Sequence, residues 1–122
     1  MRSRSWKLRI RDIVDAVRTI LGYLGYIEGM TFDDFVRDQR TMDAVVRRLT
    51  IIGEAAARVP ELVCEKYRHI PWAEMRAMRN FIVHEYFGIS EQILWETIQM
   101  DLPAIVGPLE ALLVSGKEVD ET

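Results

Sequence analysis

The segment LRIRDIVDAVRTILGYLGYI (residues 8–27) decides the fold class of this chain. Its apolar residues recur at intervals of three and four, and most of its charged residues fall between them. This spacing gathers the apolar side chains on one face of a helix, which must be buried against other elements. We therefore expect a long first helix over Leu8–Ile27, with a core-facing row made of Ile10, Ile13, Val14, Val17, Leu21 and Leu24.

Cap and stop signals predict three further helices in the next part of the chain. Thr31, followed three residues later by Asp34, is a capping pattern that opens a short helix around Phe32–Val36. Apolar spacing predicts a second long helix over about Thr41–Ala56. This helix should end before Pro60, because a residue that precedes proline disfavours the α conformation. Pro60 itself then begins a short fourth helix.

Two more helices complete the pattern. Pro71 suits the first turn of a helix, so we expect a helix over Trp72–Phe87 with Gly88 as its stop. Ser90 is the expected N-cap of a last helix, which Pro103 should kink. No segment shows the alternating Val, Ile and Thr pattern of a β-strand. The sequence therefore predicts an all-α helical bundle.

The composition is that of one globular domain. The chain has 122 residues, of which 49% are hydrophobic and 29% are charged. A chain of this length and composition can bury a sizeable core. We expect a single helical domain over residues 1–122, with flexible ends at about residues 1–5 and 116–122.

The charge balance limits the ways in which the protein could bind nucleic acid. A formal net charge of −3 argues against an extended basic surface, since non-specific affinity for phosphates comes mainly from Lys and Arg. Residues 1–18 are nevertheless rich in arginine, whereas residues from 91 onward are mostly acidic. Two interpretations stay open: a local basic patch, or solvated helix faces beside a disordered basic end.

Cysteine content and hydropathy indicate a cytoplasmic protein. Cys64 is the only cysteine, so no disulfide can form within the chain. Charged residues interrupt any signal-peptide core near the start. The longest uncharged run that we identify, Thr19–Ile27, is far shorter than the roughly 20 residues of a membrane span.

Chemically active side chains concentrate in the segment MRNFIVHEYFG (residues 78–88). It carries Arg79, Asn80, His84 and Tyr86 on an otherwise apolar helix, where Arg79 lies at the edge of an apolar stripe and would be costly without a partner. With two histidines and one cysteine, the chain has no zinc-binding spacing, and its glycines form no phosphate loop. No metal or cofactor is therefore expected.

Arg79 and His84 suit the cleavage of RNA but are poorly placed in one copy of a helix. An imidazole can transfer the proton of a 2′-hydroxyl, and a guanidinium can stabilise the charge on a phosphorane. On a continuous α-helix the two residues diverge by about 140°. Two chains packed through Ala73, Ala77 and Phe81 could combine them in one pocket, so a dimeric site is a hypothesis. A structural ion pair and a hydrogen-bonded histidine explain the same spacing.

The segment RNFIVHEY (residues 79–86) resembles the Arg-x-x-x-x-His-x-Tyr motif of HepT toxins, members of the HEPN superfamily. Glu85 occupies the variable position between the histidine and the tyrosine. The resemblance covers roughly residues 8–113, and it includes the segments IIGEAA (51–56), IPW (70–72), YFG (86–88) and WET (95–97).

This resemblance implies a HEPN-type bundle of four to five helices, a homodimer and a metal-independent endoribonuclease. Arg79 and His84 would be the catalytic pair, with Asn80 in support. The implied partner is a minimal nucleotidyltransferase antitoxin of the MntA type, which would transfer AMP to Tyr86.

Two other functions remain possible from the sequence. The first is a non-catalytic HEPN bundle that acts as a binding or scaffold protein for a nucleotidyltransferase, since such modules occur in this superfamily. The second is a bundle that binds a small molecule or a nucleotide without turnover. The intact Arg79-Asn80, His84 and Tyr86 pattern favours the ribonuclease.

Overall fold

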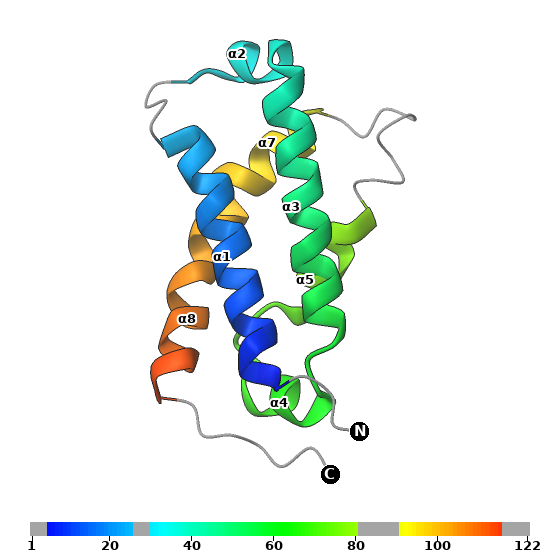
Figure 1. Ribbon diagram of the computed structural model, residues 1–122, viewed down its shortest axis with the longest axis vertical. Helices are drawn as coiled ribbons and strands as arrows, with labels where there is room; N and C mark the ends of the chain where they lie inside the picture. Colours follow the sequence, from blue (N-terminus) through cyan, green and yellow to red (C-terminus); the bar gives the residue numbers. More distant parts are fainter. Residues whose placement is uncertain (1–4, 26–29, 81–90, 116–122) are drawn as a thin grey trace.

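The computed structural model of the protein describes residues 5–25, 30–80 and 91–115, and helices make up most of these ranges (Figure 1). No strand occurs within them, so the predicted all-α class is confirmed. The α-helices are α1 (Trp6–Gly25), α2 (Phe32–Arg37), α3 (Gln39–Ala57), α4 (Glu61–Lys66), α5 (Trp72–Ala77), α7 (Glu91–Glu96) and α8 (Leu102–Ser115). A 3₁₀ turn, η1 (Met78–Asn80), follows α5, and a π-helical turn, η2 (Thr97–Asp101), joins α7 to α8.

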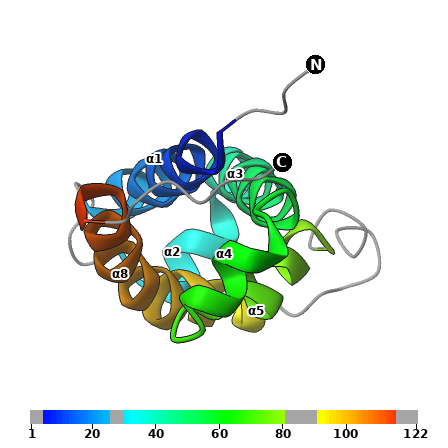
Figure 2. The same ribbon diagram turned by 90° about the horizontal axis from the view of Figure 1, so that it is seen from below.

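The long helices alternate in direction along the bundle. In Figure 1, α1 runs up, α3 runs down, α5 runs up, and α7, η2 and α8 run down. α1 packs against α3 and α8, and α3 also packs against α5 and η1. Seen from below, α1, α3, α5 and α8 form a ring, with α4 across the near end and α2 at the far end (Figure 2). This up-and-down arrangement brings α5 and η1 onto the side of α3.

The described helices contribute to one cluster of buried apolar residues. The row predicted on α1 is confirmed where its side chains are described: Ile10, Ile13, Val14 and Val17 are buried, and Leu21 is partly buried against the core. Aromatic rings close the α2 end, where the ring centroids of Phe35 and Trp95 lie 5.2 Å apart. The core thus follows from the helical spacing of apolar residues.

Hydrogen-bonded caps set the start of α2 and α3. The predicted capping box is present, because the Thr31 N–H donates to Asp34 and the Asp34 N–H donates to the Thr31 hydroxyl, both at 3.1 Å. α3 begins at Gln39, earlier than predicted, because Asp38 accepts hydrogen bonds from the hydroxyl and the backbone of Thr41 at 2.7 and 3.1 Å. These bonds, the hydroxyl one first, hold the pKa of Asp38 below its usual value.

The start of the helix predicted over Trp72–Phe87 is confirmed, but its α conformation ends earlier than predicted. The α conformation ends at Ala77, and Met78–Asn80 form a tighter 3₁₀ turn. Short 3₁₀ turns are common at helix ends. Residues 81–90, which include the expected stop at Gly88 and the expected cap at Ser90, lie outside the described residues.

The distortion expected at Pro103 takes the form of η2, immediately before it. Pro103 has no N–H to donate to the carbonyl of Gln99, and its ring would collide with that carbonyl in a regular helix. The Leu102 N–H instead bonds the Thr97 carbonyl, five residues back. The helix thus widens for one turn and then continues as α8.

The segment Glu91–Val114 is long and apolar enough, by length and composition, to cross a membrane. The sequence interpretation missed it because charges at Asp101 and Glu110 interrupt the apolar run. Core helices satisfy the same criterion. Here Leu102 and Leu109 are fully buried in the cluster that α8 shares with α1, and 33% of the apolar window is buried inside the bundle.

Leu49 and Leu62 offer a matched test of the core. Leu49 on α3 is fully buried, whereas Leu62 on α4 is 59% exposed. Leu49→Ala should lower the free energy of unfolding by about 2–5 kcal/mol, because it removes buried surface and leaves a cavity. Leu62→Ala should change it by less than about 1 kcal/mol. Urea denaturation followed by circular dichroism measures both, and equal losses would show that the core does not lie at Leu49.

Candidate functional site

Two of the predicted site residues, Arg79 and Asn80, lie in η1 directly after α5. Both side chains are exposed, whereas the preceding residue, Met78, is buried in the core. Met75, one turn earlier, is also fully buried. The two methionines therefore hold the turn on the bundle, and Arg79 and Asn80 face solvent, where they are accessible to a large substrate.

The exposure of Arg79 corrects one part of the sequence interpretation. Arg79 is not buried against an apolar face, so it needs no buried partner. The angle of about 140° between Arg79 and His84 assumed a continuous α-helix, and the described part of this segment ends in a 3₁₀ turn at Asn80, so the angle stays a prediction. His84 and Tyr86 lie outside the described residues.

η1 rests directly on α3 at Gly53. A Cβ atom built on Gly53 would lie 2.5 Å from the Arg79 backbone nitrogen, 2.8 Å from the Arg79 Cβ and 3.0 Å from the Arg76 carbonyl oxygen. Gly53 is buried near the C-terminal end of α3. The two segments can approach this closely only because Gly53 has no side chain.

Trp72 and Pro71 explain why α5 begins where it does. Pro71 stands at the N-cap position of α5, where its missing N–H costs nothing. The buried Trp72 ring donates a hydrogen bond from Nε1 to the Tyr67 carbonyl at 3.0 Å, which ties α5 to the turn after α4. Ile70 is buried beside it. The segment Ile70-Pro71-Trp72 thus anchors the helix that carries η1.

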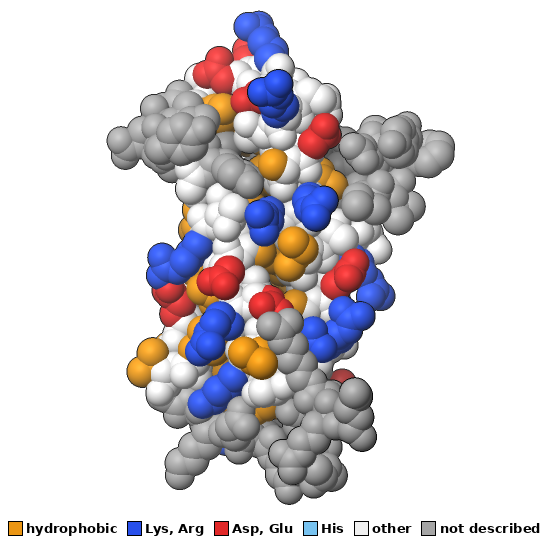
Figure 3. All heavy atoms as spheres, viewed as in Figure 1, with side chains coloured by type: hydrophobic (Ala, Val, Ile, Leu, Met, Phe, Trp, Pro, Cys, Tyr) orange, Lys and Arg blue, Asp and Glu red, His pale blue; other side chains and the backbone are white. Residues whose placement is uncertain are grey.

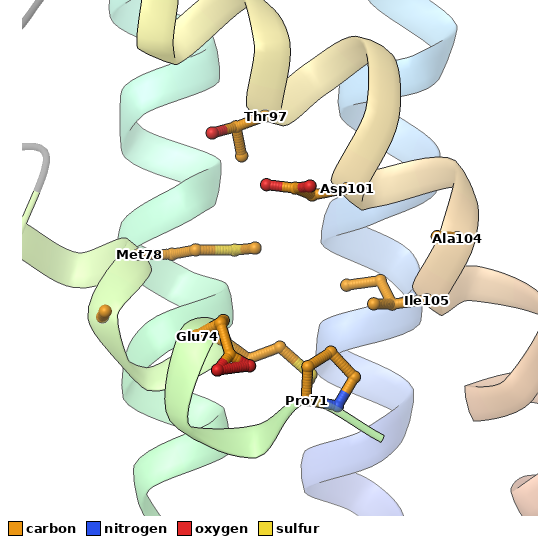
Figure 4. Close-up of a pocket in the computed structure, with 9 residues that line it drawn as sticks. Pro71, Glu74, Met78, Thr97, Asp101, Ala104 and Ile105 are labelled. Atoms are coloured by element: carbon orange, nitrogen blue, oxygen red, sulfur yellow. The ribbon is translucent and has the colours of Figure 1, made fainter. Parts of the chain in front are cut away.

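A cavity of about 230 Å³ lies on another side of α5, between that helix and the η2–α8 segment (Figure 4). Its walls are mainly apolar and include Met75, Met78 and Ile105, while Glu74 and Asp101 project from opposite sides. Arg79 and Asn80 do not line it. Of the residues suited to RNA chemistry, Arg79 and Asn80 therefore stand on an open surface outside this cavity and not in a pocket typical of small-molecule sites.

Charges on the face formed by α1 and α3 are mixed (Figure 3). Arg18 of α1, one of the exposed basic residues, pairs with Glu110 of α8. This face carries basic side chains interspersed with acidic ones and not a continuous basic stripe. Of the two interpretations left open by the sequence, this face fits solvated helix faces, and residues 1–4 lie outside the described residues.

Cys64 belongs to the structure and not to the candidate chemistry. It is buried on α4, as its neighbours in the sequence predicted. Burial raises the pKa of its thiol, and the positive charge of Arg76, whose Nη1 lies 4.0 Å from the sulfur, opposes only part of this effect. A thiol with a raised pKa is a poor nucleophile at neutral pH.

Comparisons with known proteins agree on one family. The family model described as Ribonuclease HepT-like matches residues 10–112. A probable ribonuclease HepT of Thermococcus cleftensis is 38% identical over 89% of this chain and 96% of its own length. The putative RNase TTE0752 of Caldanaerobacter subterraneus is 40% identical over 75% of this chain and 81% of its own length. No solved structure matches the chain.

Gly53 is the residue of this region whose importance the sequence interpretation missed. It stands within the segment IIGEAA, which we compared with HepT toxins without assigning the glycine a role. A glycine in the interior of a long predicted helix was the available signal, because glycine destabilises a helix relative to alanine. Its contact with Arg79 joins residues far apart in the sequence, so no local pattern could identify the partner.

Proposed function

This chain belongs to the HepT-like ribonuclease family, and we propose on this premise that it is an endoribonuclease toxin that cleaves RNA without a metal ion. One observation carries the proposal: the similarity to a probable ribonuclease HepT extends over 96% of that protein's length. The family match spans the whole segment from Arg79 to Tyr86. The exposed position of Arg79 on an open surface suits a polymeric substrate.

The proposed reaction is an internal transfer within the RNA. The 2′-oxygen of the substrate attacks the adjacent phosphorus, and the bond from phosphorus to the 5′-oxygen breaks. His84 takes the 2′-proton or protonates the departing 5′-oxygen. Arg79 stabilises the negative charge of the phosphorane, and the Asn80 amide supports it as a hydrogen-bond donor. The products are a 2′,3′-cyclic phosphate and a free 5′-hydroxyl.

A homodimer is part of the proposal. Ala73 and Ala77 lie four residues apart on α5 and share one face of it, and both are exposed. Small apolar side chains on one helix face let a second helix approach closely. Such an interface through α5 would bring η1 of each chain near its partner, so that the arginine and the histidine of one site can come from different chains.

Control by a partner completes the proposed function. We infer a cytoplasmic nucleotidyltransferase antitoxin of the MntA type that transfers AMP to Tyr86. Tyr86 is two residues from His84, so an adenylyl group on its hydroxyl would bring a phosphate charge and a base to the RNA site. Modification would thus exclude the substrate.

Arg79→Ala and His84→Ala should each abolish growth inhibition and slow RNA cleavage by about 100-fold or more, because both side chains act in the transition state. Circular dichroism should show unchanged helicity. Arg37→Ala and His69→Ala, on exposed positions away from η1, are the matched controls and should keep full activity. EDTA should have no effect, and mass spectrometry should find 2′,3′-cyclic phosphate ends. Full cleavage by His84→Ala, or no cleavage by the wild type, would favour the non-catalytic scaffold instead.

Light scattering at tens of micromolar protein should give the mass of a dimer. Ala77→Glu should lower the measured mass to that of a monomer and should also lower RNA cleavage, because the substitution places a charge in the proposed α5 interface. Ala111→Glu, on the exposed side of α8, should leave both unchanged. A wild-type chain that cleaves RNA as a monomer would rule out the composite site.

Tyr86→Phe should keep most of the ribonuclease activity and escape neutralisation, because it removes only the oxygen that accepts AMP. Co-expression of the wild type with an MntA-type partner should add the mass of AMP to the protein. The same co-expression with Tyr86→Phe should add none and should not restore growth. Full neutralisation of Tyr86→Phe, without an AMP increment on the wild type, would contradict control by modification of this residue.

A further inference from the structure

Gly53 and the backbone of Arg79 lie closer together than a residue with a side chain at position 53 would allow. Glycine inside a helix costs about 0.5–1 kcal/mol relative to alanine, so the buried Gly53 in the last third of α3 needs a reason. Gly53 does not have the positive φ angle that glycine alone tolerates. The reason lies in the three atoms that a Cβ would meet, all of which belong to α5 and η1.

These three atoms cannot move aside separately. The nearest, at 2.5 Å, is the Arg79 backbone nitrogen, and the Arg76 carbonyl oxygen at 3.0 Å is also backbone. Relief of the clash would therefore displace η1 as a unit from α3. Ordinary contact begins at 3.4 Å, so the displacement needed is 3.4 − 2.5 = 0.9 Å at the Arg79 nitrogen.

Two other glycines show that this contact is specific to Gly53. A Cβ built on Gly22 in α1 or on Gly107 in α8 would meet nothing within 4 Å. At Gly22, alanine fits the helix without displacing a neighbour, and it should stabilise the helix. Gly107 precedes Pro108, where a Cβ is disfavoured in the α conformation, so Gly22 is the matched control, at which the same Gly→Ala change acts on helix propensity alone.

We propose that Gly53 is a positioning residue for Arg79. The absence of a Cβ fixes the distance of η1 from α3 and thereby the place of the guanidinium relative to the scissile phosphate. This inference rests on the proposed function, in which Arg79 stabilises the transition state. A misplacement of about 1 Å can cost about 100-fold in rate, so a single methyl group on α3 should act on catalysis without touching the substrate.

Steady-state cleavage of a short oligoribonucleotide by Gly53→Ala tests the proposal. Its kcat should fall about 10- to 100-fold while KM changes less than about 2-fold, because the substrate still binds and only the transition-state contact is lost. Gly22→Ala should keep the wild-type kcat and melt at the same or a higher temperature. A Gly53→Ala variant that melts lower but turns over at the wild-type rate would overturn the proposal, since Gly53 would then serve packing alone.

Stability and positioning can be separated in a reinforced chain. Gly22→Ala should raise the melting temperature and offset part of any destabilisation by Gly53→Ala. The double variant should therefore be folded at the assay temperature and still show the reduced kcat. Recovery of the wild-type kcat in the double variant would mean that unfolding, and not displacement of Arg79, caused the loss.

A double-mutant cycle with Arg79→Lys identifies the residue through which Gly53 acts. Lysine has a flexible stem and a point charge, so its contribution depends less on the position of the backbone. Gly53→Ala should lower kcat less than about 3-fold in the Arg79→Lys background. If the two losses multiply, Gly53 acts independently of Arg79 and the proposal is wrong. Failure of the proposed function would look different, with no cleavage by the wild type or full activity in Arg79→Ala.

Discussion

The packing of α3 against its neighbours is the constraint on which the rest of the structure depends. α3 contacts α1, α2, α5 and η1, and eight of its residues are buried: Met42, Val45, Val46, Leu49, Ile52, Gly53, Ala55 and Ala56. The first half of this set is large and the second half is mostly small. Large residues fill the space toward the α2 end, whereas glycine and alanines let α5 and η1 come close near the other end. The gradient of side-chain size along α3 therefore determines where η1 can lie.

Sequence patterns predicted the helices well because each depends on neighbours within one or two turns. The row of apolar residues on α1 and the capping box at Thr31 are local, and the structure contains both. The end of α5 was predicted wrongly because the apolar spacing in the sequence continues past Met78, whereas the α-helical conformation ends at Ala77. At this point the backbone closely approaches Gly53 of α3, 26 residues before Arg79 in the chain. A helical pattern carries no information about such an approach.

The candidate site could be predicted in its residues but not in its setting. The order of Arg79, Asn80, His84 and Tyr86 identified the family, which the comparisons support. The sequence did not show that Arg79 and Asn80 are exposed on a short turn, because this follows from the burial of Met78 and the change to 3₁₀ geometry. An exposed turn suits an enzyme that acts on RNA, since a phosphodiester within a long RNA chain must reach the arginine side chain from solvent.

The two departures from α geometry lie on either side of one cavity. Met78 of η1 and Thr97 and Asp101 of η2 all line it, so both irregular turns meet where α5 faces the last helix. The two turns differ in what accompanies them: η1 closely approaches Gly53 of α3, whereas η2 is followed directly by Pro103.

Local rules of helix formation tend to be broken where function imposes a geometry. An arginine that acts on a substrate from an exposed turn needs a rigid base, because a flexible base would lose entropy on binding and misplace the charge. The buried methionines Met75 and Met78 and the backbone contact at Gly53 hold η1 on the bundle and could supply such a base.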